Sequence, residues 1–258
     1  MLRPRITPCL LISGGGLVKT VCFTAPKYVG DPINAVKIFN EKEADELIVL
    51  DIDATAKKQV PNERLISQFA VECRMPLCYG GGISTVEQAK RIIGLGVEKI
   101  ALGAAAIDTP ELIGAAAREI GSQSVVVVLD VRKVKNGGYE VFTHNGSRAT
   151  GLAPEAAAHL AEERGAGEIL VNSIDQDGMM KGYDLELASR VRAATGLPMS
   201  VLGGAGSLAD LRALVERCGV LGAAAGSLFV FKGTFKAVLI NYPGNAQKEE
   251  IIRAVRPG

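Results

Sequence analysis

Residues 43–53 read EADELIVLDID, and residues 165–175, 122 positions further along the chain, read GAGEILVNSID. In both stretches a glutamate precedes a short apolar run that ends in a polar side chain, and the match continues at paired proline and glycine positions downstream. Short apolar runs of this kind are typical of strands buried on both faces. A repeat period of nearly half the 258-residue chain is too long for a solenoid. It predicts two duplicated half-barrels in which each loop has a twin.

Six further apolar runs alternate with segments of helical spacing, such as TVEQAKRIIGLG at residues 85–96. Alternating strands and helices favour a parallel sheet, and eight such units in one chain predict a closed (β/α)8 TIM barrel of the α/β class. Apolar and polar side chains alternate at every second position on both sides of Asn136-Gly137, which predicts a β-hairpin in the loop after strand five. No composition break divides the chain, so we expect a single domain over residues 1–258. The other predicted strands contain ITPCLLI, PLCYG, EKIALG, SVVVVLD, PMSVLGG and VLGAAAG.

The composition argues against several classes of function. The 29 basic and 28 acidic residues nearly balance, so we expect no binding to nucleic acid or to an anionic membrane surface. No apolar run reaches the roughly 18 residues of a membrane helix, and the start lacks the apolar core of a signal peptide. Five scattered cysteines without a CxxC pair indicate reduced thiols in a cytoplasmic protein. Since the only histidines are His144 and His159, we expect no metal site, and no motif indicates a cofactor.

Two glycine-rich turns occur at twin positions, residues 80–82 and 203–206. Each is followed one strand later by a turn of small residues, at 103–104 and at 225–227. Glycine lets a backbone approach a ligand closely, and the N-terminus of the next helix offers unpaired N–H groups to an anion. Barrels often bind phosphate after strands seven and eight, where the second set lies. Two sets half a barrel apart predict a substrate with a phosphate at each end, although glycines can also serve only to make tight turns.

Catalytic side chains of such barrels lie at the carboxyl ends of the strands. Asp130 follows the apolar run VVVVL, which places its carboxylate at the barrel mouth, unless it merely caps a helix or anchors the hairpin. Asp51 and Asn172 end two other strands, and Lys19 lies on the first loop, where a mobile cation could cover an anionic substrate. By the repeat, with a slightly different offset, the counterpart of Asp130 is Leu11.

A second polar set begins the strands at the opposite end of the predicted barrel. It consists of two basic and two acidic residues, Arg5, Glu46, Lys99 and Glu168. Buried charges at the base of a barrel must pair, so we expect a ring that closes the base. Such a ring is either a structural plug or a gate.

Many short motifs then support a resemblance that covers residues 1 to about 232. They include PCL, Lys19, GDP, ADEL, LDI, GGGI, GSQSVVV before Asp130, GAGEIL, DQDG, GYD and GGAG. With these motifs the chain resembles the cyclase subunit of imidazole glycerol phosphate synthase. That family is a duplicated (β/α)8 barrel that takes ammonia from a class I glutaminase docked at its base. It passes the ammonia through the core to a bis-phosphorylated substrate at the top, where cleavage and imidazole ring closure follow.

Carried over position by position, the resemblance assigns roles to the candidate residues. It makes Asp130 a catalytic acid/base and Lys19 the loop cation, and it makes the four charged residues at the base an ammonia gate. The positions that it assigns to substrate and phosphate binding are Asp51, Gly81, Gly82, Gly103, Asn172, Asp177, Gly178, Gly203, Gly204, Gly226 and Ser227.

The sequence departs from this family at the top of the barrel. Leu11 stands where the family has a catalytic aspartate, Gly103-Ala104 replaces an Asn-Thr pair, and Asn172 replaces a threonine. General acid–base catalysis is typically worth about 10²–10⁴-fold, which a leucine cannot supply. The tail FVFKGTFKAVLINYP also differs from the usual ending. These departures resemble second-copy members associated with surface-polysaccharide clusters. Those members pair with a glutaminase and an N-acetyl sugar amidotransferase to turn acetamido groups into acetamidino groups.

Three hypotheses follow from the sequence. In the first hypothesis, the chain is an ammonia-conducting synthase subunit of the sugar-amidation branch. Alternatively, it is a true histidine-pathway cyclase that tolerates Leu11 and produces imidazole glycerol phosphate. The third alternative is a non-catalytic scaffold that activates the glutaminase and passes ammonia to another protein.

Overall fold

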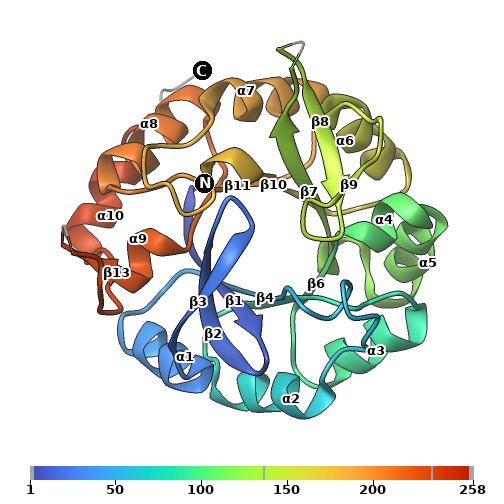
Figure 1. Cartoon of the computed structure of the whole chain (residues 1–258), viewed down its shortest axis with the longest axis horizontal. Helices are drawn as coiled ribbons and strands as arrows, with labels where there is room; N and C mark the ends of the chain where they lie inside the picture. The colour runs from blue at the N-terminus through green and yellow to red at the C-terminus, as the bar shows by residue number, and fades with distance from the viewer. Residues whose placement is uncertain (1–2, 136, 234, 256–258) are drawn as a thin grey trace.

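The computed structural model describes residues 3–135, 137–233 and 235–255. Eight parallel strands close into a barrel surrounded by helices, which confirms the predicted (β/α)8 fold (Figure 1). In order around the barrel, the strands are β1 (Arg5–Ser13), β4 (Leu47–Asp51), β5 (Leu77–Gly80), β6 (Lys99–Leu102), β7 (Val125–Lys133), β10 (Glu168–Ser173), β11 (Met199–Leu202) and β12 (Gly222–Ala225), which pairs with β1.

Several helices on the outside begin at side chains that bond free backbone N–H groups. Thr85 and Gln88 form a capping box at the start of α3, and their twins Ser207 and Asp210 form another at the start of α8. The repeat therefore extends to the helix ends. The helices are α1 (Pro32–Glu41), α2 (Glu63–Glu72), α3 (Val86–Gly94), α4 (Ala104–Asp108), α5 (Glu111–Ile120), α6 (Pro154–Glu163), α7 (Leu185–Ala194), α8 (Leu208–Cys218), α9 (Ser227–Val230) and α10 (Asn245–Ile252), with 3-10 turns η1 (Ser122–Ser124) and η2 (Ile174–Gln176).

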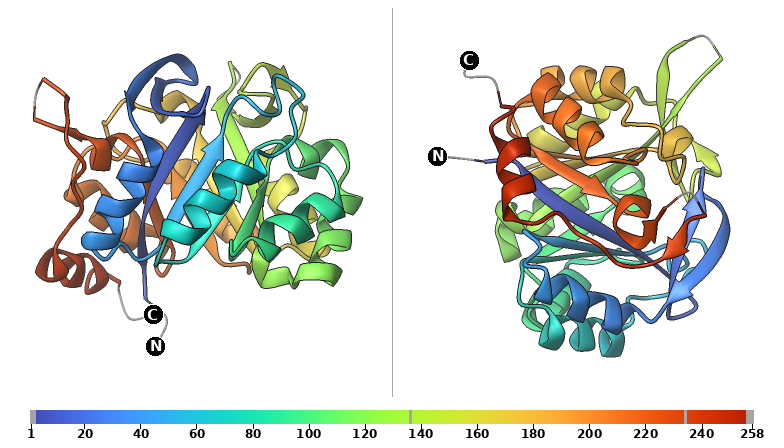
Figure 2. Two further views of the ribbon diagram at one scale, coloured as in Figure 1. Left: turned by 90° about the horizontal axis from the view of Figure 1, so that it is seen from below. Right: turned by 90° about the vertical axis from the view of Figure 1, so that its left-hand side faces the viewer.

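Extra strands stand on the carboxyl end of the barrel, toward the top of the left view in Figure 2. The hairpin predicted after strand five is present, since β7 pairs antiparallel with β8 (Tyr139–Thr143) and β8 pairs with β9 (Arg148–Ala149). Its predicted turn residue Asn136 lies outside the described residues. Another hairpin, β2 (Gly16–Val21) with β3 (Thr24–Gly30), follows β1 and is not predicted from the sequence; it is the first hairpin along the chain, and the one after strand five is the second.

The two hairpins are twins in position, because β1 and β7 open the two halves of the barrel. Each is anchored by the twin aspartate of the next loop. Asp53 accepts hydrogen bonds from the Ser13 hydroxyl and the Gly14 N–H, both at 2.9 Å. Asp175 accepts one from the Lys133 N–H at 2.8 Å. The duplication therefore explains why hairpins occur after strands one and five.

Two apolar layers hold the barrel together. The larger packs the outer faces of the strands against the helices, and the smaller fills the barrel interior with residues that include Cys9, Ile48, Val126 and Leu170. Past the eighth barrel strand, β13 (Phe231–Lys232) and β14 (Ala237–Val238) form a short hairpin ahead of α10. Among the described residues, no helix has the length and apolar character needed to cross a membrane.

Candidate active site

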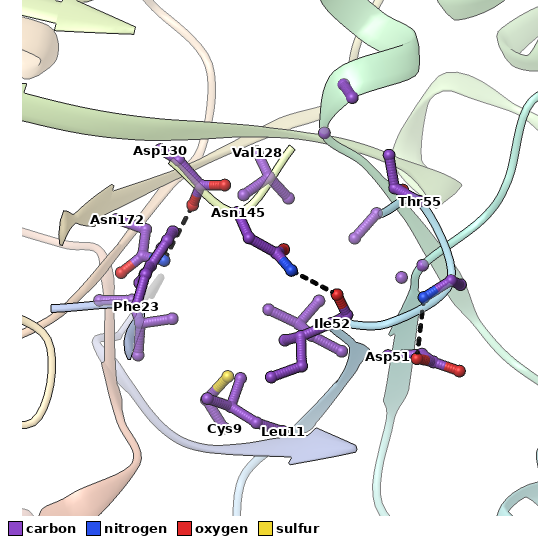
Figure 3. A pocket seen from close by; sticks show the side chains of 18 of the residues that line it. Cys9, Leu11, Phe23, Asp51, Ile52, Thr55, Val128, Asp130, Asn145 and Asn172 are labelled. Carbon is purple, nitrogen blue, oxygen red and sulfur yellow. Dashed lines mark hydrogen bonds between the residues drawn. The ribbon is translucent and has the colours of Figure 1, made fainter. Parts of the chain in front are cut away.

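A cavity of about 470 Å³ opens at the carboxyl ends of the barrel strands. The candidate catalytic and binding residues predicted at the top of the barrel line it, and Figure 3 labels four of them, Leu11, Asp51, Asp130 and Asn172. The full set is Leu11, Lys19, Asp51, Gly81, Gly82, Gly103, Asp130, Asn172, Asp177, Gly178, Gly203, Gly204, Gly226 and Ser227. The structure thus brings together side chains that are up to 216 positions apart, from Leu11 to Ser227 (227 − 11).

Asp130 and Asn172 form the polar pair of this cavity. They lie opposite one another on neighbouring strands, β7 and β10, and the Asn172 Nδ2 donates to the Asp130 Oδ1 at 2.9 Å. Burial raises the pKa of Asp130 from an ordinary 3.8 to about 7, although the hydrogen bond from Asn172 lowers it; the nearby Asp177 carboxylate adds to the rise. A carboxyl group of this pKa can both hold and release a proton near neutrality, as a general acid/base must.

The strand register shows what stands at the twin positions. In one half of the barrel Asp130 pairs with Asn172, and in the other Leu11 pairs with Leu50, which is 122 positions before Asn172 (172 − 50). Leu11 is therefore the geometric counterpart of Asp130. Figure 3 shows the two on opposite sides of the cavity. In one half of the mouth this strand pair has a hydrogen-bonded carboxyl group, and in the other half the twin pair is apolar.

Lys19 is not on an open loop, as the sequence predicted, but in strand β2. It is only 6% exposed, and its Nζ donates to the backbone oxygen of Cys9 at 2.8 Å. Burial lowers its pKa, against the opposing effects of Cys9 and Asp177. Gly226 leaves the space that the ammonium needs, since a Cβ at this position would collide with Nζ. The hairpin carries this cation into the mouth of the barrel, beside the cavity.

Two hydrogen bonds at the cavity join segments from different halves of the barrel, and no pattern in the sequence indicates either of them. The Thr20 hydroxyl donates to the Asp177 carboxylate at 2.6 Å, which ties the first hairpin to the loop after β10. The Asn145 Nδ2 donates to the Ile52 carbonyl oxygen at 2.6 Å, which ties the second hairpin to the loop after β4 (Figure 3). All four of these residues line the cavity, so each contact joins the two halves of the barrel at the cavity wall.

The predicted glycines fall into two groups. Gly81 and Gly204 have φ of 125° and 107°. A Cβ at Gly81 would strike the backbone of Asp51 and one at Gly204 the backbone of Gly182, so each has a structural reason to be glycine. Gly103 has a negative φ and open space where a Cβ would lie. Nothing in the fold therefore requires glycine at position 103, and a larger residue fits there.

The base of the barrel holds the predicted ring. Arg5 bonds Glu46 at 2.8 Å and Glu168 at 2.6 Å, and Lys99 bonds the same two carboxylates at 2.7 and 2.8 Å. Both glutamates are at most 5% exposed. Burial opposes the ionisation of Glu168, but Arg5 and Lys99 outweigh it and hold the pKa of this carboxyl group below its usual value. The four charges alternate in sign and compensate one another in a closed cycle.

Fold and site together define a duplicated barrel with a polar cavity at one end and a charged ring at the other. A family model described as "Histidine biosynthesis protein" matches residues 5–236. The chain is 56% identical over 252 residues to "Putative imidazole glycerol phosphate synthase subunit HisF" of Leptospira interrogans, covering 97% of this chain and 99% of the relative. It is 54% identical over 243 residues to "Putative imidazole glycerol phosphate synthase subunit hisF2" of Pseudomonas aeruginosa, covering 94% and 97%.

The chain is also similar to relatives whose names do not contain the word "Putative". "Imidazole glycerol phosphate synthase subunit HisF" of Lactococcus lactis subsp. cremoris is 40% identical over 230 residues, covering 89% of each chain. The chain therefore belongs to the histidine-biosynthesis barrel family, as a relative of the cyclase subunit of imidazole glycerol phosphate synthase.

Proposed function

We propose that the chain is a synthase subunit that receives ammonia at its base from a class I glutaminase and joins it to a phosphorylated substrate in the cavity. Three features support this proposal. The ring of Arg5, Glu46, Lys99 and Glu168 occupies the end where a partner would deliver ammonia. The cavity with Asp130 occupies the other end, and the interior between them is lined by small and apolar side chains.

The contrast between Asp130 and Leu11 carries the finer part of the proposal. Imidazole ring closure in this family relies on two carboxylates, and here one of the twin positions has only a hydrocarbon side chain. We infer that the chain serves a different acceptor, in the conversion of an acetamido group of a sugar into an acetamidino group. That exchange forms a carbon–nitrogen bond to ammonia and breaks the carbon–oxygen bond of the amide, so the oxygen must leave on a phosphoryl or nucleotidyl group supplied by a nucleoside triphosphate, and Asp130 would move the protons. An N-acetyl sugar amidotransferase would then be a further partner.

Similarity to relatives favours one alternative. Relatives named as imidazole glycerol phosphate synthase subunits share about two fifths of their residues with this chain. In this alternative the chain is a histidine-pathway cyclase, and Asp130 carries the chemistry without a second carboxylate. The more similar relatives named hisF2 and hisF3 argue against this alternative, because numbered names agree with a second-copy role.

Complementation separates these functions. A strain that lacks its histidine-pathway cyclase should fail to grow without histidine when it receives this chain, and growth at the rate of the authentic gene would contradict our proposal. The scaffold hypothesis is tested with Asp130→Asn in a strain that makes an acetamidino sugar. If the modification is lost while the glutaminase complex still forms, the barrel is catalytic. An unchanged product would favour the scaffold.

A further inference from the structure

The C-terminal segment reaches the base of the barrel next to the ring. Tyr242 precedes α10, and the left view of Figure 2 shows this helix at the end of the barrel where the N-terminus lies. The Tyr242 hydroxyl donates to the Ile6 carbonyl oxygen at 2.7 Å and accepts the Asp45 N–H at 3.1 Å. From α10, Lys248 forms an ion pair with Asp45 at 3.2 Å and donates to the Glu43 carbonyl oxygen at 3.1 Å.

This contact replaces missing sheet hydrogen bonds. Strand β1 pairs with β4 only from Cys9 and Ile48 onward, because β4 begins at Leu47 and Pro8 has no N–H to donate. Ile6 would therefore face β4 with an unpaired N–H and carbonyl, which is costly inside a protein. The Asp45 carboxylate accepts the Ile6 N–H at 2.9 Å, and the Tyr242 hydroxyl supplies the donor for the carbonyl. Side chains thus complete the ladder at the base.

The residues so joined are the direct neighbours of two members of the ring. Ile6 follows Arg5, and Asp45 precedes Glu46, and these two ring members bond each other at 2.8 Å. Arg5 is also the most exposed member, with 31% of its side chain accessible against 17% or less for the other three. The Arg5 side chain therefore has the most freedom to leave the ring. Its backbone is the part that the C-terminal segment holds.

We propose that Tyr242, Asp45 and Lys248 form a clamp that positions Arg5 against Glu46 and keeps the ring closed. Tyr242 and Lys248 lie beyond residue 236, where the match to the family model ends, whereas Asp45 lies within the matched residues. The Tyr242 ring packs against Phe39 and Phe229, which leaves the hydroxyl as the part that bridges the two strands. These are positioning residues that act through Arg5. The inference rests on the proposed role of the ring as the entrance for ammonia.

The variant Tyr242→Phe tests the clamp, because it removes the hydroxyl and keeps the packing of the ring. Tyr183→Phe is a matched control, since the Tyr183 hydroxyl also donates to a carbonyl oxygen of a barrel strand, that of Ala224, at 2.8 Å. Loss of one neutral hydrogen bond changes a two-state population about three- to tenfold, and Tyr242→Phe removes both bonds of the hydroxyl, those with Ile6 and Asp45, so this factor is a lower bound. In the complex of Tyr242→Phe with the glutaminase, the ratio of ammonia released to solvent to ammonia used in product should rise by at least that factor. Turnover with free ammonia should stay the same, and Tyr183→Phe should behave as wild type in both assays.

A measurement on the chain alone gives a second readout. Two fixed ion pairs keep the guanidinium protons of Arg5 slow to exchange, so NMR should show about three- to tenfold faster exchange in Tyr242→Phe but not in Tyr183→Phe. Equal Arg5 exchange in both variants would overturn the clamp. In the assay of the glutaminase complex, Lys99→Leu distinguishes a failure of the clamp from a failure of the proposed ammonia gate. If Lys99→Leu releases ammonia and Tyr242→Phe does not, the clamp is wrong and the gate stands. If neither variant releases ammonia, the gate itself is wrong, and the clamp fails with it.

Discussion

Replacing Asp130 by asparagine should change how the stability of the protein depends on pH. The folded state raises the pKa of this carboxyl group from 3.8 to about 7, so between these values the folded chain keeps a proton that the unfolded chain has lost. The stability from this proton is complete below about pH 4, and it is lost as the pH rises through 7. Wild type should therefore lose stability between pH 5 and pH 7 through this group, whereas Asp130→Asn should not.

The size of the effect follows from the shift. Each pKa unit is worth about 1.4 kcal/mol, so the two units from pH 5 to pH 7 correspond to about 3 kcal/mol. The carboxyl group borders the cavity, where water weakens the effect of burial, and we expect about 2 kcal/mol. The assay is urea unfolding of both proteins at several values from pH 5 to pH 8, at constant ionic strength. The free energy of unfolding of the variant, minus that of wild type, should rise by this amount with pH.

A second variant checks the cause of the shift. The hydrogen bond from Asn172 lowers the pKa of Asp130, so Asn172→Leu should move the loss of stability to higher pH. A difference between Asp130→Asn and wild type that stays flat from pH 5 to pH 8 would refute the reasoning. So would a difference that falls with pH, because it would mean that the fold favours the ionised carboxylate.

Three other predictions concern the two ends of the barrel. Lys99→Leu leaves two buried glutamates with Arg5 alone and should lower the free energy of unfolding by about 3 kcal/mol, measured in urea, and a loss within error of zero would contradict the ring. Leu11→Asp should raise turnover of the bis-phosphorylated cyclase substrate in ammonium buffer about tenfold, and no increase would mean that this carboxylate is not what the site lacks. Sulfate titrated by NMR should bind more tightly beside Ser227 than beside Gly103. Gly103→Asn, which the open space there accommodates, should strengthen the second site, and unchanged binding would count against a phosphate at that end.

The barrel could be predicted because its signals are local and occur twice. Barrel strands are buried on both faces, so the runs near Leu50 and Leu170 are continuously apolar and differ from the helical segments between them. The ring could be predicted for a related reason. Charged side chains at the starts of strands cannot be left unpaired in a barrel base, and the twins Glu46 and Glu168 fall there together.

No local pattern predicts the first hairpin, although the repeat implies a twin for the hairpin after strand five, and its turn explains why. Cys22 and Phe23 have positive φ values of 48° and 63°, a conformation usually signalled by glycine or asparagine, and neither residue is present in that turn. Lys19 was therefore placed on a loop although it lies in a strand. The Tyr242 clamp joins positions 236 residues apart, and no local pattern reports a contact of that range.

The most direct test of the central claim is a glutamine-driven assay of this chain with its cognate glutaminase. Two acceptors are compared under identical conditions, the bis-phosphorylated cyclase substrate and a nucleotide-linked N-acetyl sugar with its amidotransferase. The proposal predicts that nitrogen from labelled glutamine appears in an acetamidino group and that little imidazole product forms. Asp130→Asn should abolish the transfer while glutamine hydrolysis continues. Rapid formation of imidazole glycerol phosphate by wild type, with no labelled sugar, would contradict the account and show that Leu11 is compatible with ring closure.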